Sequence, residues 1–158
     1  GYTYGRTARR YPTLNGGEYF APRHDRRHAV NLAAFVNLSE GWRTSVTFKY
    51  ATGQPYTRPA TQYQLVDSPY MGHNHYVLRS ELNGTRLPPY QRLDLGVTRR
   101  GTVVGSLSYE IQMQVVNVLS SDNVWFDLYQ PDNGAAIERT RILQIPVPLP
   151  NLSLGLQF

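Results

Sequence analysis

Two histidines, His73 and His75, are the residues whose spacing could bind a metal ion. Side chains at positions i and i+2 project from the same side of an extended segment, so both imidazoles could ligate one ion. The chain has no cysteine, and the carboxylates nearest to this pair in sequence are Asp67 and Glu81. Two imidazoles alone do not complete a tetrahedral ligand set. We therefore predict no metal and no cofactor, with His73 and His75 as minor candidates.

His24, Asp25 and His28 form a second group with catalytic residue types. A histidine oriented by a carboxylate acts as a general base when it serves a nucleophile. The chain contains no Gly-x-Ser-x-Gly sequence, which marks the nucleophile turn of one large class of hydrolases. The three residues instead open a stretch with strand character. We therefore expect that the chain is not an enzyme.

A third group of polar residues lies in or beside the longest connection between predicted strands, residues 59–89. Loops on a rigid scaffold often carry binding function. A simply solvated loop is the alternative interpretation. The residues that could contact a ligand here are Arg58, His73, His75, Tyr76 and Arg79.

Composition favours extended structure, because 158 residues include 12 Tyr, 13 Gly and 11 Pro but only 17% charged residues. The hydrophobic content of 41% would also suffice for the core of a soluble domain. A net charge of +5 is compatible with a nucleic-acid or a membrane surface. No stretch reaches the roughly 18 consecutive apolar residues of a transmembrane helix, so insertion into a membrane would require a β-barrel.

Strict alternation of apolar and polar residues is the clearest pattern, and it is typical of strands with two different faces. It covers residues 30–38, 42–50, 107–115 and 152–158, and it recurs more weakly at 2–11 and 92–98. The polar side of these runs includes Lys49, Arg92, Asp94 and Glu110, which we expect to pair on that side. The predicted strands are 1–11, 28–38, 42–58, 90–100, 106–129 and 138–158.

The connections between these strands alternate between long and short. Residues 12–27, 59–89 and 131–135 are the connections on one side, and residues 39–41 and 101–105 are those on the other. Transmembrane barrels have tight turns on the periplasmic side, longer loops outside, and aromatic residues at both boundaries. With the short connections on the periplasmic side, the aromatic residues expected near the inner boundary are Tyr2, Tyr4, Trp42, Tyr109 and Phe158. Those expected near the outer boundary are Tyr50, Tyr56, Tyr90, Trp125, Phe126 and Tyr129.

The predicted fold class is therefore all-β, an antiparallel transmembrane β-barrel, here with about six strands. The smallest barrels of this kind have about eight strands. Further strands must then come from the same polypeptide or from another chain. A soluble β-sandwich also alternates and is the competing fold.

Six segments occur in an order and spacing that resemble the C-terminal end of TonB-dependent outer-membrane receptors, in the carboxypeptidase-regulatory-like or SusC-like branch. They are YTYGRT (2–7), LNGGEYF (14–20), DRRH (25–28), YATGQPY (50–56), LPPYQRLDL (87–95) and VNV (116–118). The resemblance implies a 22-stranded barrel with a plug, which imports a scarce ligand such as an iron chelate, glycan, peptide or vitamin. This chain lacks the plug and would supply the last six strands.

The resemblance also implies partners and a location. The partners are outer-membrane lipid, the rest of the barrel with its plug, the barrel-assembly machinery and a surface lipoprotein, but no nucleic acid. The location is the bacterial outer membrane. Carried over by position, the barrel-assembly signal of the last strand is Leu152, Leu154, Leu156 and Phe158, although simple contact with lipid would require the same residues.

Two other functions stay open from the sequence. One is a structural barrel component that assembles with other chains and does not transport. The other is a soluble basic β-domain that binds nucleic acid, which would gather arginines and exposed aromatic residues on one sheet face.

Overall fold

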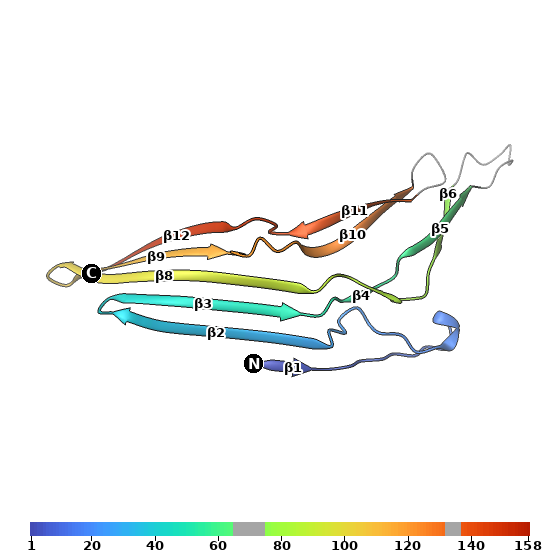
Figure 1. Cartoon of the computed structure of the whole chain (residues 1–158), viewed down its shortest axis with the longest axis horizontal. Coiled ribbons are helices and arrows are strands. Elements are labelled where there is room, and N and C mark those ends of the chain that lie inside the picture. The colour runs from blue at the N-terminus through green and yellow to red at the C-terminus, as the bar shows by residue number, and fades with distance from the viewer. Residues whose placement is uncertain (65–74, 132–136) are drawn as a thin grey trace.

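The computed structural model describes residues 1–64, 75–131 and 137–158, and β-strands are the main regular structure of this part of the chain. Its main feature is a six-stranded sheet in the order β1-β2-β3-β8-β9-β12 (Figure 1), in which every neighbouring pair is antiparallel. The all-β, antiparallel class predicted from the alternation is thus confirmed. The strands are β1 (Tyr2–Tyr4), β2 (His28–Ser39), β3 (Trp42–Ala51), β8 (Tyr90–Val104), β9 (Leu107–Val116) and β12 (Leu149–Gln157).

Two tight turns lie together at one end of this sheet. Glu40 and Gly41 connect β2 to β3, and Gly105 with Ser106 connects β8 to β9 (Figure 1, left). Gly41 has a φ of 74°, and a Cβ there would lie 2.4 Å from the backbone oxygen of Arg100. Only glycine fits such a position without strain. We call this end of the sheet the turn end.

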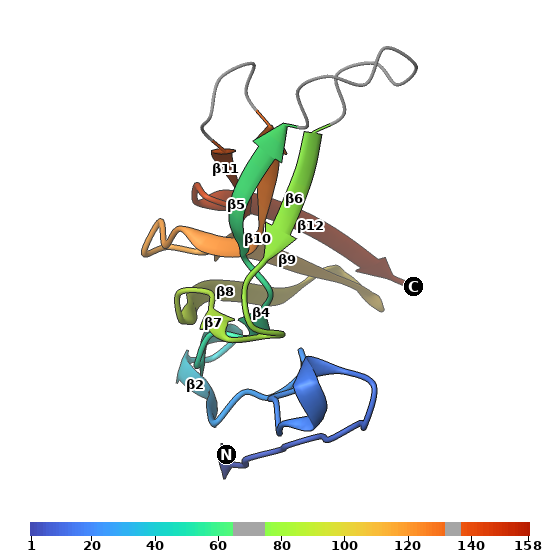
Figure 2. The same ribbon diagram turned by 90° about the vertical axis from the view of Figure 1, so that its right-hand side faces the viewer.

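The opposite end, here called the loop end, carries three smaller two-stranded units. β4 (Pro55–Tyr56) pairs with β7 (Thr85–Arg86), β5 (Pro59–Gln64) pairs with β6 (His75–Arg79), and β10 (Asn123–Pro131) pairs with β11 (Ile137–Gln144). Figure 2 looks at this end of the molecule, and it shows β5 and β6 turning away from the direction of the main strands. The connection predicted over 59–89 therefore contains strands of its own. A short 3-10 turn, η1 (Asn15–Gly17), lies between β1 and β2.

Two predicted strands end earlier in the structure than the sequence suggested. The strand predicted over 42–58 stops at Ala51 and resumes only as β4, because Gly53 packs directly on the backbone of Leu87. A Cβ at Gly53 would lie 1.6 Å from the carbonyl oxygen of Leu87. The strand predicted over 1–11 is three residues long, followed by a single bridge between Arg9 and Phe20.

Two further predicted strands, 106–129 and 138–158, are each divided into two. Asn117 and Ile145 interrupt them with φ angles of 57° and 45°. The fully buried Asn117 donates from Nδ2 to the carbonyl oxygen of Ile145 at 2.7 Å, and its backbone N–H donates to Oδ1 of Asp94 at 3.0 Å. These bonds separate the β9–β12 pairing from the β10–β11 hairpin.

The buried Asn123 joins the β10–β11 hairpin to the main sheet. Its Nδ2 donates to the carbonyl oxygen of Gln91, and the N–H of Gln91 donates to its Oδ1, both at 2.8 Å. These two side-chain hydrogen bonds take the place of two backbone–backbone hydrogen bonds at the point where β10 leaves the sheet. The hairpin is therefore attached to β8 at its base.

The main sheet has almost no hydrophobic core beneath it. Within the described residues, Ala51 and Leu87 are the buried hydrophobic ones. The accessible surface of the chain is 11441 Å² for 18.0 kDa, whereas a compact monomer of this mass exposes about 8,000 Å². The sheet is a single open layer with β1 and β12 as its edges, and the described strands form no closed barrel.

In the part of the chain that the structure describes, no helix has the length and apolar character needed to cross a membrane.

Candidate functional site

Strand register gathers the apolar side chains of all the long strands on one face of the main sheet. One row across the sheet consists of Val36, Thr44, Val97, Met113 and Leu152, which are paired in turn from β2 to β12. In an antiparallel sheet, directly paired residues project to the same face. The alternation read separately in each run therefore describes one continuous surface. We call it the apolar face.

The apolar face is not covered by another layer of the described chain. Leu152 is 69% exposed, and Met113 and Val36 are 57% and 52% exposed. Contiguous exposed apolar surface of this extent marks contact with a membrane or another protein. Other members with large exposed side chains are Leu32, Leu95, Ile111, Leu154 and Leu156.

One charged residue, Arg99, lies on the apolar face near the turn end, directly opposite Trp42. Its guanidinium carbon lies 5.2 Å from the centre of the Trp42 ring, and Nη1 donates to the carbonyl oxygen of Glu40 at 2.8 Å. A cation over an indole ring is stabilised by the charge distribution of the ring. The charge is thus drawn toward the β2–β3 turn rather than left among the aliphatic side chains.

The opposite face of the sheet is polar. The row adjacent to the one above reads Asn37, Arg43, Thr98, Gln112 and Ser153. We call this surface the polar face. On β2 this face also carries the apolar residues Ala29, Ala33 and Phe35, and Phe35 is 70% exposed.

The charged residues predicted to share the polar face do lie on it, but they pair only in part as expected. Arg92 and Asp94 form an ion pair at 2.8 Å, with the Asp94 side chain almost fully buried. Glu110 pairs with Arg100, which the sequence prediction did not include. Lys49 stands opposite Arg92 in the β3–β8 register.

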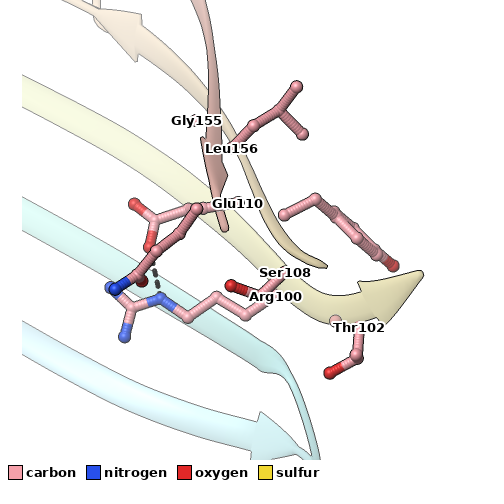
Figure 3. A pocket seen from close by; sticks show the side chains of 9 residues that line it. Arg100, Thr102, Ser108, Glu110, Gly155 and Leu156 are labelled. Carbon is pink, nitrogen blue, oxygen red and sulfur yellow. Dashed lines mark hydrogen bonds and ion pairs between the residues drawn. The ribbon is translucent and has the colours of Figure 1, made fainter. Parts of the chain in front are cut away.

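A hollow of about 660 Å³ lies over β8, β9 and β12 near the turn end (Figure 3). The Arg100–Glu110 pair crosses it, and the absence of a side chain at Gly155 leaves the space open. Thr102 and Ser108 add hydroxyl groups to its wall. The hollow is polar and its charges are balanced, so its residues suggest no reaction.

At the loop end, Asp25 ties together segments that are far apart in the sequence. The N–H of Thr7 donates to its Oδ1 at 2.7 Å, and Arg86 forms an ion pair with Oδ2. Arg86 also donates to the carbonyl oxygens of Asp25 and Gly53 at 2.8 and 3.0 Å. Burial opposes ionisation of Asp25, but the Thr7 amide and the Arg86 guanidinium outweigh it, so its pKa lies below the ordinary 3.8.

The catalytic residue types at His24, Asp25 and His28 therefore do not form a histidine–carboxylate pair. Asp25 binds Thr7 and Arg86, while Nδ1 of His28 lies 2.8 Å from the hydroxyl of Tyr2. Within the described residues, no three His, Cys, Asp or Glu side chains lie together as metal ligands.

Tyr56, Asp127 and Tyr129 connect the β4–β7 pair to the β10–β11 hairpin. The Tyr56 hydroxyl donates to Oδ2 of Asp127 at 3.1 Å and lies 3.0 Å from the Tyr129 hydroxyl. Burial, followed by the Tyr129 and Asp127 contacts, raises the pKa of Tyr56, so the phenol stays protonated. Arg141 approaches Oδ1 of Asp127 at 3.5 Å. Nothing in the sequence indicated this cluster, because Tyr56 is more than 70 residues away from Asp127 and Tyr129.

The predicted ligand contacts are only partly described. His73 lies outside the described residues, and His75 and Tyr76 belong to β6 but their side chains lie outside the described part. Arg58 precedes β5 and Arg79 ends β6, and both side chains are exposed.

The residues predicted as an assembly signal lie at the edge of the sheet. Leu152, Leu154 and Leu156 project from β12 on the apolar face and are 69%, 66% and 56% exposed. Phe158 follows β12 at the turn end and is 91% exposed. This placement would serve lipid contact and assembly equally, so the assembly role stays a prediction.

The aromatic prediction needs one correction. Tyr2 pairs with Val30 and Tyr4 with His28, at the start of β2, so both lie toward the loop end and not at the turn end. The physical reason is that β1 is short and pairs only with the beginning of β2. Trp42 and Tyr109, by contrast, do lie at the turn end.

No known relative emerges from comparison. Neither a family model, nor a curated protein, nor a solved structure matches this chain.

Proposed function

We propose that this chain forms part of the wall of an outer-membrane β-barrel, with hydrocarbon against the apolar face and water or a plug against the polar face. The observation that carries the proposal is the register, which sorts apolar and polar rows of the five long strands onto opposite faces of a single uncovered layer. A soluble sandwich would bury such a face against a second sheet.

Strand lengths and connections support the proposal. The long strands of the sheet have 12, 10, 15, 10 and 9 residues, and a tilted strand needs about 9 to 11 residues to cross a bilayer. Tight turns at one end and longer hairpins at the other match the periplasmic and outer sides of such barrels. Arg99 over Trp42 fits the inner boundary, where an arginine reaches polar headgroups and an indole prefers to lie.

The two edges of the sheet call for further strands. Backbone groups on the outer sides of β1 and β12 lack strand partners among the described residues. In lipid, each unpaired group costs several kcal/mol. We therefore propose that additional strands, from the same polypeptide or another, close the barrel with a plug inside, and that the assembled protein imports a scarce ligand, as the resemblance to TonB-dependent receptors implies.

Fractionation and uptake test this function at two levels. The polypeptide that contains this chain should sediment with the outer membrane and should need detergent or lipid to remain folded and monodisperse. Deleting its gene should abolish energy-dependent uptake of one scarce nutrient. A folded monomer in plain buffer would contradict the wall, whereas a membrane-embedded protein without any uptake defect would indicate a structural barrel component.

A further inference from the structure

A cavity of about 360 Å³ lies at the loop end, between the start of β5 and the β10–β11 hairpin. This volume falls within the range of small-molecule sites, about 300 to 1,000 Å³. Residues from both elements form it, so the cavity depends on the way the two hairpins meet. Its walls include Arg58, Pro59, Ala60, Tyr129, Ile137 and Arg139.

The cavity carries two positive charges and no negative one. Arg58 and Arg139 are exposed, and neither guanidinium forms an ion pair within residues 1–64, 75–131 and 137–158. Asp127 projects from the same face of the β10–β11 hairpin as Arg139, but its two oxygens already face Tyr56 and Arg141. The uncompensated charge favours an anion.

The other described hollows carry less excess charge: two are balanced, and two have a single excess positive charge, from Arg26 in one and from Arg43 and Arg100 against Glu40 in the other. A neighbouring cavity of about 530 Å³ contains both Arg23 and Asp127, and the hollow on the polar face contains the Arg100–Glu110 pair. The cavity of Arg58 and Arg139 is therefore the one among these hollows that carries two uncompensated positive charges.

The backbones that carry the two arginines are fixed. The carbonyl oxygen of Arg58 accepts hydrogen bonds from the N–H and Oγ of Ser80 at 2.9 and 2.7 Å. Arg139 pairs with Tyr129 across the β10–β11 ladder, and the Tyr129 hydroxyl is bonded to Tyr56. A site whose supports are already ordered loses less entropy when a ligand binds.

We propose that this cavity binds a doubly charged oxyanion, as in a phosphate monoester or a vicinal dicarboxylate. A guanidinium presents paired N–H donors that match the oxygens of carboxylate or phosphate groups. Pro59, Ala60 and Ile137 offer apolar contact to the carbon part of the ligand. The inference rests on the proposed function only for placing the cavity outside the membrane, where a free solute or a lipid headgroup could supply the group.

Calorimetric titration of the purified polypeptide in zwitterionic detergent tests the site, with glycerol phosphate, succinate and acetate as probes. We expect saturable binding of at least one doubly charged probe and none of acetate. Arg58→Gln and Arg139→Gln should each weaken binding about tenfold, the effect of losing one charged hydrogen-bonding partner. Arg23→Gln, the matched control, should change affinity by no more than about twofold, because salt screens exposed charges outside the site.

Vesicles that contain anionic phospholipid distinguish the two sources. Displacement of the bound solute by such vesicles would identify a headgroup as the ligand, and its retention would identify a free solute; both results support the site. If Arg58→Gln does not assemble, Arg58→Lys, which keeps the charge but loses the paired donors, should weaken binding by a smaller factor. No saturable binding of any probe, or equal losses in Arg23→Gln and Arg58→Gln, would overturn the proposal. The titration can be run in buffer if the protein proves not to be membrane-bound, so failure of the site is distinct from failure of the wall.

Discussion

Arginine in place of Met113 should largely prevent assembly of the polypeptide into the outer membrane, whereas arginine in place of the adjacent Gln112 should be tolerated. Met113 is 57% exposed on the apolar face, between Val97 and Leu152. Gln112 lies on the polar face of the same strand. An arginine near the middle of the bilayer costs about 2 to 4 kcal/mol, which corresponds to roughly a 30- to 700-fold change in an equilibrium constant.

The measurement is the fraction of each variant that migrates as the compact, heat-sensitive form in an outer-membrane preparation. Gln112→Arg is the matched control, because it introduces the same side chain one residue away. Equal loss in both variants would mean that the two faces do not differ in their surroundings, and the assignment of lipid to the apolar face would be wrong.

Replacing Asp25 by Asn should open the segment between β1 and β2 at neutral pH. The change removes the carboxylate that Thr7 and Arg86 hold and leaves a partly buried guanidinium without its counter-ion. Breaking a fully buried pair costs about 3 to 5 kcal/mol, and the 29% exposure of the Arg86 side chain lowers this to about 2 kcal/mol because solvent screens the charge. Limited proteolysis of residues 5–27 should be correspondingly faster.

The effect of Asp25→Asn should depend on pH in one direction. Because the folded-state pKa of Asp25 lies below its ordinary value of 3.8, the carboxylate stabilises the fold at every pH above that value. Its contribution is lost as the pH falls through the depressed folded-state pKa. Wild type and variant should therefore differ at pH 7 and converge in acid. The exposed Asp122→Asn is the control, and a difference that grew on acidification would contradict the assigned pairing.

The pattern of the sequence predicted the main sheet because a period of two is preserved by antiparallel pairing. The runs 107–115 and 152–158 each have one apolar side, and their direct antiparallel pairing places those sides on the same face of the sheet. The predicted faces follow from local information alone. The same information placed Trp42 at the turn end.

The loop end could not be predicted in this way, because its structure depends on contacts between distant residues. Asn117 holds the carbonyl oxygen of Ile145, 28 residues away, and thereby divides two strands that alternate almost without interruption. The contact of Tyr56 with Asp127 spans 71 residues. In the sequence, Asn117 stands out only as part of the motif VNV (116–118). The local pattern does not indicate which carbonyl oxygen its side chain contacts.

The environment of each side chain along β9 tests the central claim most directly. The chain has no cysteine, so single cysteines from Ser108 to Val115 can each carry a fluorophore in the membrane-assembled polypeptide. A quencher dissolved in the lipid acyl chains should act at Tyr109, Ile111, Met113 and Val115, and should spare Ser108, Glu110, Gln112 and Gln114. Quenching without this alternation, or protection of the apolar positions from the lipid quencher, would show that hydrocarbon does not contact the apolar face.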